Sequence, residues 1–141
     1  MRFMIIVKAT KDSEAGVRPS EELFAAMADY HEQLVKAGVL LDASGLQPTS
    51  KGWRVRYSGG KRSVVDGPFA ESKELVGGFY IVEVKSREEA IDWALRCPTG
   101  LGFDDVLEIR QLTGEEDIPP PILDLLKSAA PTWSATFSRP R

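Results

Sequence analysis

The stretch that decides the fold is residues 66–84, which read DGPFAESKELVGGFYIVEV. It begins at the end of one expected strand, turns at Gly67-Pro68, and crosses a short charged connection. Leu75 to Val84 is then strongly apolar, which predicts a central strand of a sheet. Gly77-Gly78 near its start predicts a bulge or a close approach of neighbouring backbone. Charged turns between sheet segments often carry functional residues, so residues 66–74 are the first place to look for a site.

Two short strands are expected directly before this stretch, over residues 53–57 and 62–66. Gly59-Gly60 between them predicts a two-residue hairpin loop of the primed type. Because cross-strand partners share a face, this loop places a mainly apolar set of side chains together. That set is Trp53, Val55, Tyr57, Val64 and Asp66. Arg54 and Arg56 lie on the other face, which is read as an ordinary solvated face rather than an anion site.

Strands and helices alternate in the rest of the chain. Residues 3–7 are apolar and predict a strand buried on both faces, and a further strand starts at residue 39. Ser20 is the expected N-cap of the first helix, which Gly38 ends. Ser86 opens a second helix through a capping box with Glu89, and residues 106–112 form the last strand.

With the hairpin set aside, the expected order is β-α-β-β-α-β, the ferredoxin-like arrangement of an α+β protein. Two helices cover only one face of such a sheet, yet residues 3–7 and 75–84 are apolar on both faces. A second copy packed sheet to sheet would cover the other face, so we expect a homodimer that forms a dimeric α+β barrel.

The domain is expected to span residues 1–113, followed by a C-terminal extension over residues 114–141. This extension has an acidic and proline-rich spacer, a short helix expected at residues 122–127, and two large apolar side chains, Trp133 and Phe137. Large apolar groups are rarely left wholly in water. We therefore expect the extension to dock on the domain or on a partner subunit, with Trp133 and Phe137 largely buried.

Composition narrows the class of protein. The formal net charge of −3 argues against nucleic acid as the main partner. No apolar stretch approaches the ~18 residues that a membrane span needs, and the N-terminal run is too short for a signal peptide. Cys97 is the only cysteine, so an intrachain disulfide is impossible. We expect a cytoplasmic protein without cofactor or metal, because no phosphate loop, nucleophile elbow or metal-ligand spacing is present.

Several motifs together resemble the DGPF branch of the YCII-related (YciI-like) domain family. They are residues 66–74 with Gly78-Phe79, residues 86–90, residues 37–41 with Gly45-Leu46, and residues 108–111. The resemblance implies a dimeric ferredoxin-like barrel and leaves the activity open. Shorter members resemble muconolactone isomerase and carry a histidine on the first helix, which aligns near Met27, one turn before His31. DGPF proteins are also often encoded beside extracytoplasmic-function sigma factors, which keeps a regulatory role open.

His31 and Asp66 are the candidate catalytic residues. His31 is the only histidine, and its charge changes near neutral pH, as a general acid or base requires. The alternative is a partly buried histidine with a hydrogen-bond partner. Asp66 is a candidate cleft carboxylate, and the alternative is a cap for the amides of the Gly-Pro turn.

Five further residues are candidates for binding a small-molecule ligand: Asp42, Ser44, Phe69, Glu71 and Lys73. We expect residues 66–74, the first helix and the strand end at Asp42–Ser44 to form one cleft. The alternatives are a solvated, self-neutralising turn for Glu71 and Lys73, and an exposed strand end for Asp42 and Ser44.

Two functions remain open at this point. The first is a small cofactor-free acid/base enzyme, isomerase- or lyase-like, acting on a small organic molecule. The second is a non-catalytic ligand-binding or regulatory protein, linked to extracytoplasmic-function sigma factors. A cleft that holds His31 and Asp66 within hydrogen-bond reach of each other would favour the first.

Overall fold

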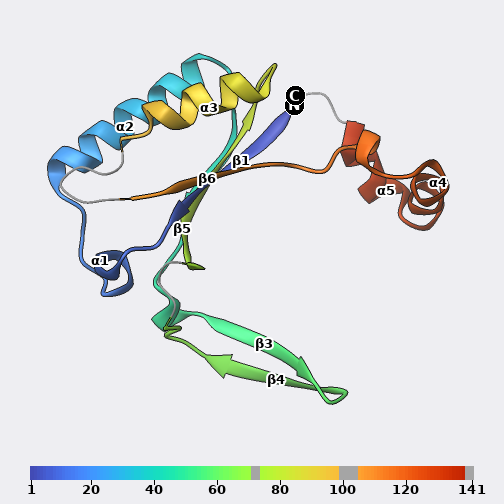
Figure 1. The fold of residues 1–141 in the computed structure, drawn as a ribbon, viewed down its shortest axis with the longest axis horizontal. Helices are drawn as coiled ribbons and strands as arrows, with labels where there is room; N and C mark the ends of the chain where they lie inside the picture. The colour runs from blue at the N-terminus through green and yellow to red at the C-terminus, as the bar shows by residue number, and fades with distance from the viewer. Residues whose placement is uncertain (71–73, 99–104, 139–141) are drawn as a thin grey trace. The chain divides into compact units, whose positions relative to one another are not determined.

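A computed structural model of the chain describes residues 1–70, 74–98 and 105–138 (Figure 1). The predicted Glu71 and Lys73 lie outside these residues. The chain divides into two compact units, Met1–Arg110 and Gln111–Arg141. Each unit is described by itself.

The main sheet has four strands in the order β2-β5-β1-β6. Their bounds are Arg2–Lys8 for β1, Leu40–Gly45 for β2, Val76–Glu83 for β5 and Leu107–Gln111 for β6. β5 lies between β2 and β1 and is antiparallel to both, so the predicted central strand is confirmed. With α2 (Glu21–Lys36) and α3 (Arg87–Arg96), the order around the hairpin is β1-α2-β2-β5-α3-β6. The predicted α+β architecture with a ferredoxin-like element order is therefore present.

Local capping explains where the two helices begin and end. The Ser20 hydroxyl accepts a hydrogen bond from the Leu23 amide, and Gly38 after α2 has a φ of +71°, as predicted. The Ser86 hydroxyl likewise accepts from the Glu89 amide at 3.1 Å. The Glu89 carboxylate reaches back to the amide of Lys85 instead of that of Ser86, so the expected capping box is shifted by one residue.

The glycine pair in β5 fulfils both of its predicted roles. Val7 pairs with Gly78 and Lys8 pairs with Val76, which leaves Gly77 as the extra residue of a bulge. A Cβ atom on Gly78 would lie only 3.0 Å from the carbonyl oxygen of Ser44 on β2. The edge strand can therefore approach β5 closely at this point.

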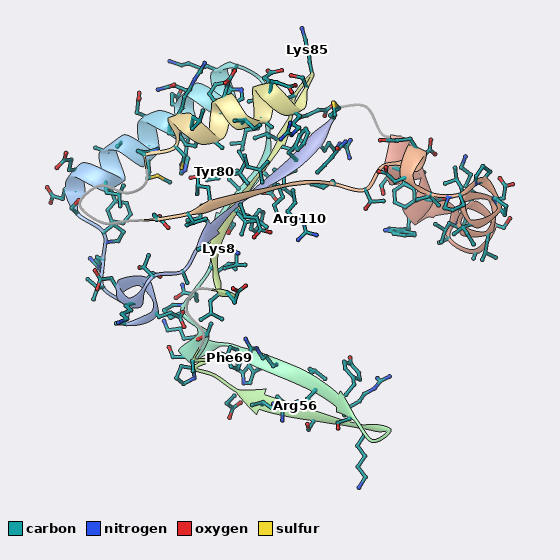
Figure 2. All side chains as sticks on the ribbon, viewed as in Figure 1. Lys8, Arg56, Phe69, Tyr80, Lys85 and Arg110 are labelled. Atoms are coloured by element: carbon teal, nitrogen blue, oxygen red, sulfur yellow. The ribbon has the colours of Figure 1, made fainter. Side chains whose placement is uncertain are left out.

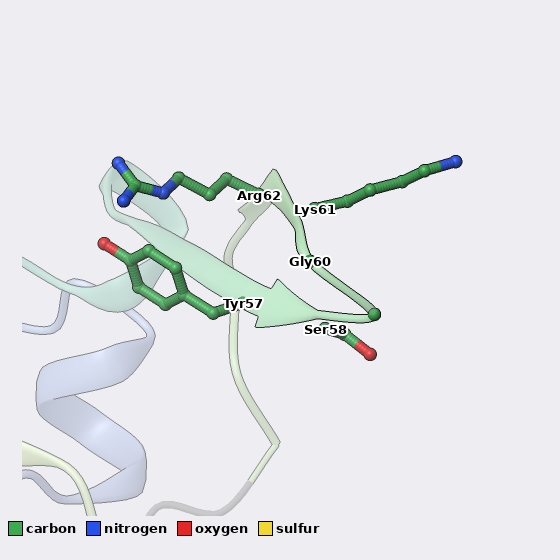
Figure 3. A pocket seen from close by; sticks show the side chains of 6 residues that line it. Tyr57, Ser58, Gly60, Lys61 and Arg62 are labelled. Carbon is green, nitrogen blue, oxygen red and sulfur yellow. The ribbon is translucent and has the colours of Figure 1, made fainter.

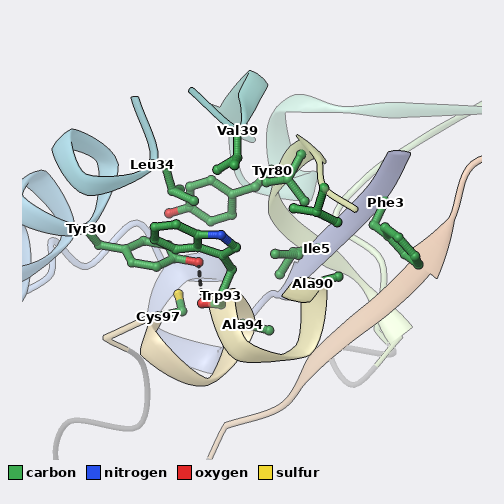
Figure 4. Packing of buried hydrophobic residues seen from close by; sticks show 12 residues of the cluster. Phe3, Ile5, Tyr30, Leu34, Val39, Tyr80, Ala90, Trp93, Ala94 and Cys97 are labelled. Atoms are coloured by element: carbon green, nitrogen blue, oxygen red, sulfur yellow. Dashed lines mark hydrogen bonds between the residues drawn. The ribbon is translucent and has the colours of Figure 1, made fainter. Parts of the chain in front are cut away.

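The core lies between the sheet and the two helices, which cover the same face of the sheet (Figures 1 and 4). Its members come from both layers: Phe3, Ile5, Tyr30, Leu34, Val39, Tyr80, Val82, Val84, Ala90, Trp93, Ala94 and Cys97. Along β1, Phe3 and Ile5 are buried while Met4 and Ile6 between them are only partly buried. β1 was predicted to be buried on both faces, but within the single chain only its helix-facing side is fully buried.

The hairpin forms a separate two-stranded sheet of β3 (Trp53–Ser58) and β4 (Lys61–Asp66). Its register pairs Trp53 with Asp66 and continues as predicted to the turn. Gly59 and Gly60 have φ values of +58° and +75°, the left-handed pair that a type I′ turn requires. The hairpin prediction is therefore confirmed.

Two short elements between the strands were not predicted. α1 (Lys11–Glu14) occupies part of the expected polar loop, and Thr10 and Ser13 cap it reciprocally. The 3₁₀ helix η1 (Thr49–Lys51) follows Pro48 and directly precedes the hairpin. Both elements anchor the turn at the base of the hairpin.

The C-terminal unit consists of η3 (Glu115–Asp117), α4 (Pro120–Ala129), α5 (Pro131–Ser134) and η4 (Ala135–Ser138). Pro120 and Pro121 begin α4, as expected for residues that lack an amide donor. Trp133 is 54% exposed, and its ring lies 4.8 Å from that of Phe137. The C-terminal unit by itself does not bury Trp133, so the expected docking on the domain or on a partner subunit stays a prediction. Among the described helices of both units, none combines the length and apolarity needed to cross a bilayer.

Candidate functional site

The His31 imidazole on α2 contacts the Tyr80 hydroxyl on β5. The His31 Nε2 atom and the Tyr80 hydroxyl oxygen are 2.7 Å apart, and the two ring centroids are 5.3 Å apart. Tyr80 is only 4% exposed and points from the central strand into the core (Figure 4). His31, in contrast, is exposed. One nitrogen of the imidazole is therefore held by the core while the residue remains open to solvent.

A cluster of aromatic rings holds Tyr80 in place. The Tyr30 ring meets the Tyr80 ring edge to face, with centroids 5.6 Å apart. The Tyr30 hydroxyl donates to the Trp93 carbonyl oxygen at 2.8 Å, which ties α2 to α3 (Figure 4). Burial raises the pKa of both tyrosines well above its ordinary value. Tyr80 therefore meets His31 as a neutral hydroxyl at neutral pH.

This arrangement supplies one oriented acid/base group. A hydrogen bond to one imidazole nitrogen fixes the orientation of the ring, and the other nitrogen is left for exchange with a bound molecule. With Nε2 on Tyr80, Nδ1 is the nitrogen that remains. Sequence reasoning selected His31 but missed Tyr80, whose only signal was a hydroxyl on the core-facing side of the central strand.

The Gly67-Pro68 turn, which has a cis peptide bond, is fixed by residues before the hairpin. The Phe69 amide donates to the Thr49 hydroxyl oxygen at 3.0 Å, and the Gly67 amide donates to the Gly52 carbonyl at 2.9 Å. A Cβ atom on Gly67 would collide with the Thr49 carbonyl oxygen, so the close approach requires glycine.

Glu14 completes the anchor of this turn. Its carboxylate accepts from the Thr49 amide at 2.9 Å and from the Thr49 hydroxyl. Glu14 and Thr49 are 35 residues apart in the chain, and nothing in either local sequence signals the contact. Sequence reasoning therefore missed both residues.

The Asp66 carboxylate takes no part in holding the turn. It is exposed, and among the described residues no hydrogen bond or ion pair reaches it. Among the described residues, Asp66 does not cap the amides of the Gly-Pro turn. The Phe69 amide bonds to Thr49 and the Gly67 amide bonds to Gly52 instead. Within the same residues, His31 contacts Tyr80 and no bond joins it to Asp66.

Phe69 lies under an arginine of the hairpin. The guanidinium carbon of Arg54 is 3.8 Å from the Phe69 ring centroid, a cation–π contact. Figure 2 labels Phe69 beside the base of the hairpin and Arg56 further along it. Phe69 is thereby partly covered by the arginine, so its predicted role in binding a ligand remains a prediction.

Asp42 and Ser44 are exposed on the edge strand β2 and bond locally. Asp42 accepts from the Ala43 amide, and Ser44 donates to the Gly45 carbonyl. Ala43 is the partner of Tyr80 in the register, so its neighbours Asp42 and Ser44 lie on the opposite sheet face. The expected single cleft between the first helix and this strand end is therefore not formed by these residues.

A hollow of about 330 Å³ lies at the tip of the hairpin (Figure 3). It is lined by Tyr57, Ser58, Gly59, Gly60, Lys61 and Arg62. None of the candidate site residues borders it, and we assign it no chemistry.

Two other kinds of chemistry find no support in the described part of the chain. No group of histidine, cysteine, aspartate or glutamate side chains there is arranged to hold a metal ion. Cys97 is buried, and burial followed by the charge of Asp105 raises the pKa of its thiol to about 11. A thiol of such high pKa is a core residue rather than a nucleophile.

The model of the YCII-related domain matches residues 1–113. An uncharacterised protein, R00369 of Rhizobium meliloti (strain 1021), is 38% identical over 74 residues, which is 52% of this chain. The chain matches 60% of that relative's own length.

A solved structure also resembles the chain at low similarity. It is the 5-chloro-2-hydroxyhydroquinone dehydrochlorinase TftG from Burkholderia phenoliruptrix AC1100, in complex with 2,5-dihydroxybenzoquinone. The sequence identity is 18% and the TM-score 0.47, over 84% of this chain and 100% of that one. A likeness at this level carries no argument about the chemistry of the present chain.

Proposed function

Because the chain belongs to the YCII-related domain family, whose model spans residues 1–113, we propose a function within that family. The protein is a cofactor-free acid/base enzyme that moves a proton on a small organic molecule, as an isomerase or lyase does. The observation that carries this proposal is the 2.7 Å contact between His31 Nε2 and the Tyr80 hydroxyl.

The proton-transfer group in this mechanism is His31. In its acid form the imidazolium carries a proton on each nitrogen: Nε2–H donates to the Tyr80 oxygen, and the Nδ1 proton can pass to the substrate. Loss of that proton leaves a lone pair on Nδ1 for the reverse step. Tyr80 thus acts as the positioning residue, since it holds Nε2 and leaves Nδ1 to react.

Asp66 and the other predicted residues of its turn, Phe69, Glu71 and Lys73, enter this proposal as substrate contacts, whereas Asp42 and Ser44 lie on the sheet face opposite Tyr80 and do not. The exposed and uncommitted Asp66 carboxylate supports such a role, because no structural bond among the described residues occupies it. Asp66→Asn should weaken substrate binding more than it slows the proton transfer itself, if this role is right.

The proposed enzyme is a cytoplasmic homodimer packed through the sheet face opposite the helices. Met4 and Ile6 on β1, with Phe79 and Ile81 on β5, lie on that face and are only partly buried. Equilibrium sedimentation at micromolar concentration tests the assembly. A stable folded monomer at that concentration would contradict the proposed homodimer.

The activity is tested with α-angelica lactone, whose double bond migrates by proton transfer, in deuterated buffer. Wild type should speed isomerisation and deuterium uptake, and His31→Gln should lower the rate by roughly 10²-fold or more. Tyr80→Phe should lie between them, with a fold unchanged by circular dichroism. Equal rates for wild type and His31→Gln would remove His31 from the mechanism.

A second candidate is a non-catalytic ligand-binding or regulatory protein, including one that works with extracytoplasmic-function sigma factors. The lack of a bond between His31 and Asp66 in the described residues favours it. Wild type is tested with both α-angelica lactone and acetylacetone. If neither isomerisation nor deuterium uptake occurs with either compound, the second candidate is favoured over the enzyme.

A further inference from the structure

The hairpin of β3 and β4 exposes one apolar face that no described part of the Met1–Arg110 unit covers. Trp53 and Tyr57 are each 69% exposed, Val64 is 67% exposed and Val55 is 53% exposed. The register and the strand alternation place all four side chains on the same face. A contiguous patch of large apolar groups marks an interaction surface.

The hairpin also lacks the support that such an element needs. It forms its own two-stranded sheet, without strand pairing to the main sheet. Isolated two-stranded hairpins are only marginally stable in water and gain independent stability from a further packed layer. The apolar face is where that layer is missing.

The charges on this face have a polarity along the strands. At one end Asp66 lies opposite Trp53, and at the other Arg62 lies opposite Tyr57, with its guanidinium 5.1 Å from the Tyr57 ring centroid. The pair Val55 and Val64 lies midway between these ends. Along the strands, this face therefore carries a carboxylate at one end, apolar side chains at the centre and a guanidinium group at the other end.

From this polarity we propose that the occupant is the same hairpin face of a second copy of this chain. A two-fold axis perpendicular to the strands at Val55 and Val64 sets each Asp66 opposite the partner's Arg62. An axis parallel to the strands would instead gather both Asp66 carboxylates at one end and both Arg62 guanidinium groups at the other, with no ion pair between them, which disfavours it. Two Asp66–Arg62 pairs then flank an apolar centre of Val55 and Val64, with Trp53 and Tyr57 beside the charged ends. An Asp66 carboxylate paired in this way does not bind a substrate, so this interface and the substrate contact proposed for Asp66 are alternatives.

The opposite hairpin face agrees with this assignment. It carries Arg54 and Arg56 on β3, and both side chains belong to exposed residues. Arg54 is engaged with Phe69 of its own chain. Two copies meeting through that face would bring four guanidinium groups together, so it stays toward solvent.

Disulfide trapping tests this interface directly, whether or not the main sheets also pair. The full chain is suitable because its only cysteine, Cys97, is 8% exposed. Val64→Cys lies next to the proposed axis, where a residue meets its own copy within disulfide range. The matched control is Ser63→Cys, an exposed neighbour on the other face.

Mild oxidation at micromolar concentration should link Val64→Cys chains into dimers and leave Ser63→Cys chains unlinked. Equal linking of the two variants, or no linking of Val64→Cys, overturns the proposal. The second outcome would assign the face to a partner other than this chain.

Charge reversal tests the Asp66–Arg62 pairing within the trapped interface. In the Val64→Cys background, Asp66→Arg alone and Arg62→Asp alone should each slow trapping by about tenfold, because each opposes like charges twice. A one-to-one mixture of the two variants restores both pairs in mixed dimers, which make up half of all encounters, and should link at about half the parental rate. A mixture that links no faster than either variant alone contradicts the proposed axis.

Discussion

Replacing Thr49 by valine should destabilise the fold more than any change at Asp66. The substitution keeps the shape of the side chain and removes its oxygen, which accepts from the Phe69 amide and donates to the Glu14 carboxylate. A neutral hydrogen bond contributes about 0.5–1.5 kcal/mol to stability, and one to a charged group about 1.5–3 kcal/mol. Because all three residues are only partly buried, we expect a total loss of about 1–3 kcal/mol.

The assay is urea unfolding at one fixed protein concentration, followed by tryptophan fluorescence and by circular dichroism. Thr49→Ser is the matched control, since it keeps the oxygen and should stay within about 0.5 kcal/mol of wild type. Asp66→Asn should lose less than about 1 kcal/mol, because no bond within the described chain reaches that carboxylate. If Asp66→Asn costs more than Thr49→Val, the turn is held by Asp66 and the reasoning is refuted.

Three further predictions concern the sheet, the core and the tail. Gly78→Ala should lower stability by about 1–3 kcal/mol, because its Cβ would press on the Ser44 carbonyl oxygen. Gly45→Ala is the control, since a Cβ atom there meets no atom within 4 Å. Equal melting temperatures of the two variants would refute this prediction. Burial raises the Cys97 pKa from 9.0 to about 11, so the unfolded chain loses the thiol proton at a lower pH than the folded chain does. The contribution of the neutral thiol to folding stability is therefore complete below pH 9 and is lost as the pH rises towards 11. In Cys97→Ala, the fall in unfolding free energy between pH 9 and 11, measured by urea titration, should be smaller by up to about 2–3 kcal/mol. The same dependence of unfolding free energy on pH in both proteins would contradict the assignment. Truncation after Gly114 should lower the melting temperature or weaken the dimer if the tail docks on a partner, and sedimentation with calorimetry checks both.

Much of the fold could be predicted because its signals are local. Gly59-Gly60 fixes a two-residue turn, and this turn determines which residues of the two hairpin strands pair with each other. Gly38 and the serine caps mark the helix ends for the same reason, since each acts within a few residues of itself. The central strand followed from its length and apolar content.

The candidate site could be predicted only in part because its contacts are long-range. His31 was identifiable as the single histidine, but its partner Tyr80 is 49 residues away, and only the packing of α2 on β5 brings them together. Thr49 and Glu14 carry no motif, so their anchoring of the Gly-Pro turn was invisible. The cleft with Asp42 and Ser44 failed because the face of an edge strand depends on its register, which residues 40–45 do not fix alone.

The measurement that tests the central claim most directly is ¹⁵N NMR of the histidine ring, whose two nitrogen signals are unambiguous because His31 is the only histidine. In the proposed mechanism neutral His31 carries its proton on Nε2, directed at the Tyr80 hydroxyl 2.7 Å away, and leaves Nδ1 unprotonated for proton transfer. This mechanism predicts an Nε2–H proton that exchanges slowly with water in wild type and becomes unobservable in Tyr80→Phe. A neutral ring protonated on Nδ1, or identical spectra for wild type and Tyr80→Phe, would contradict it.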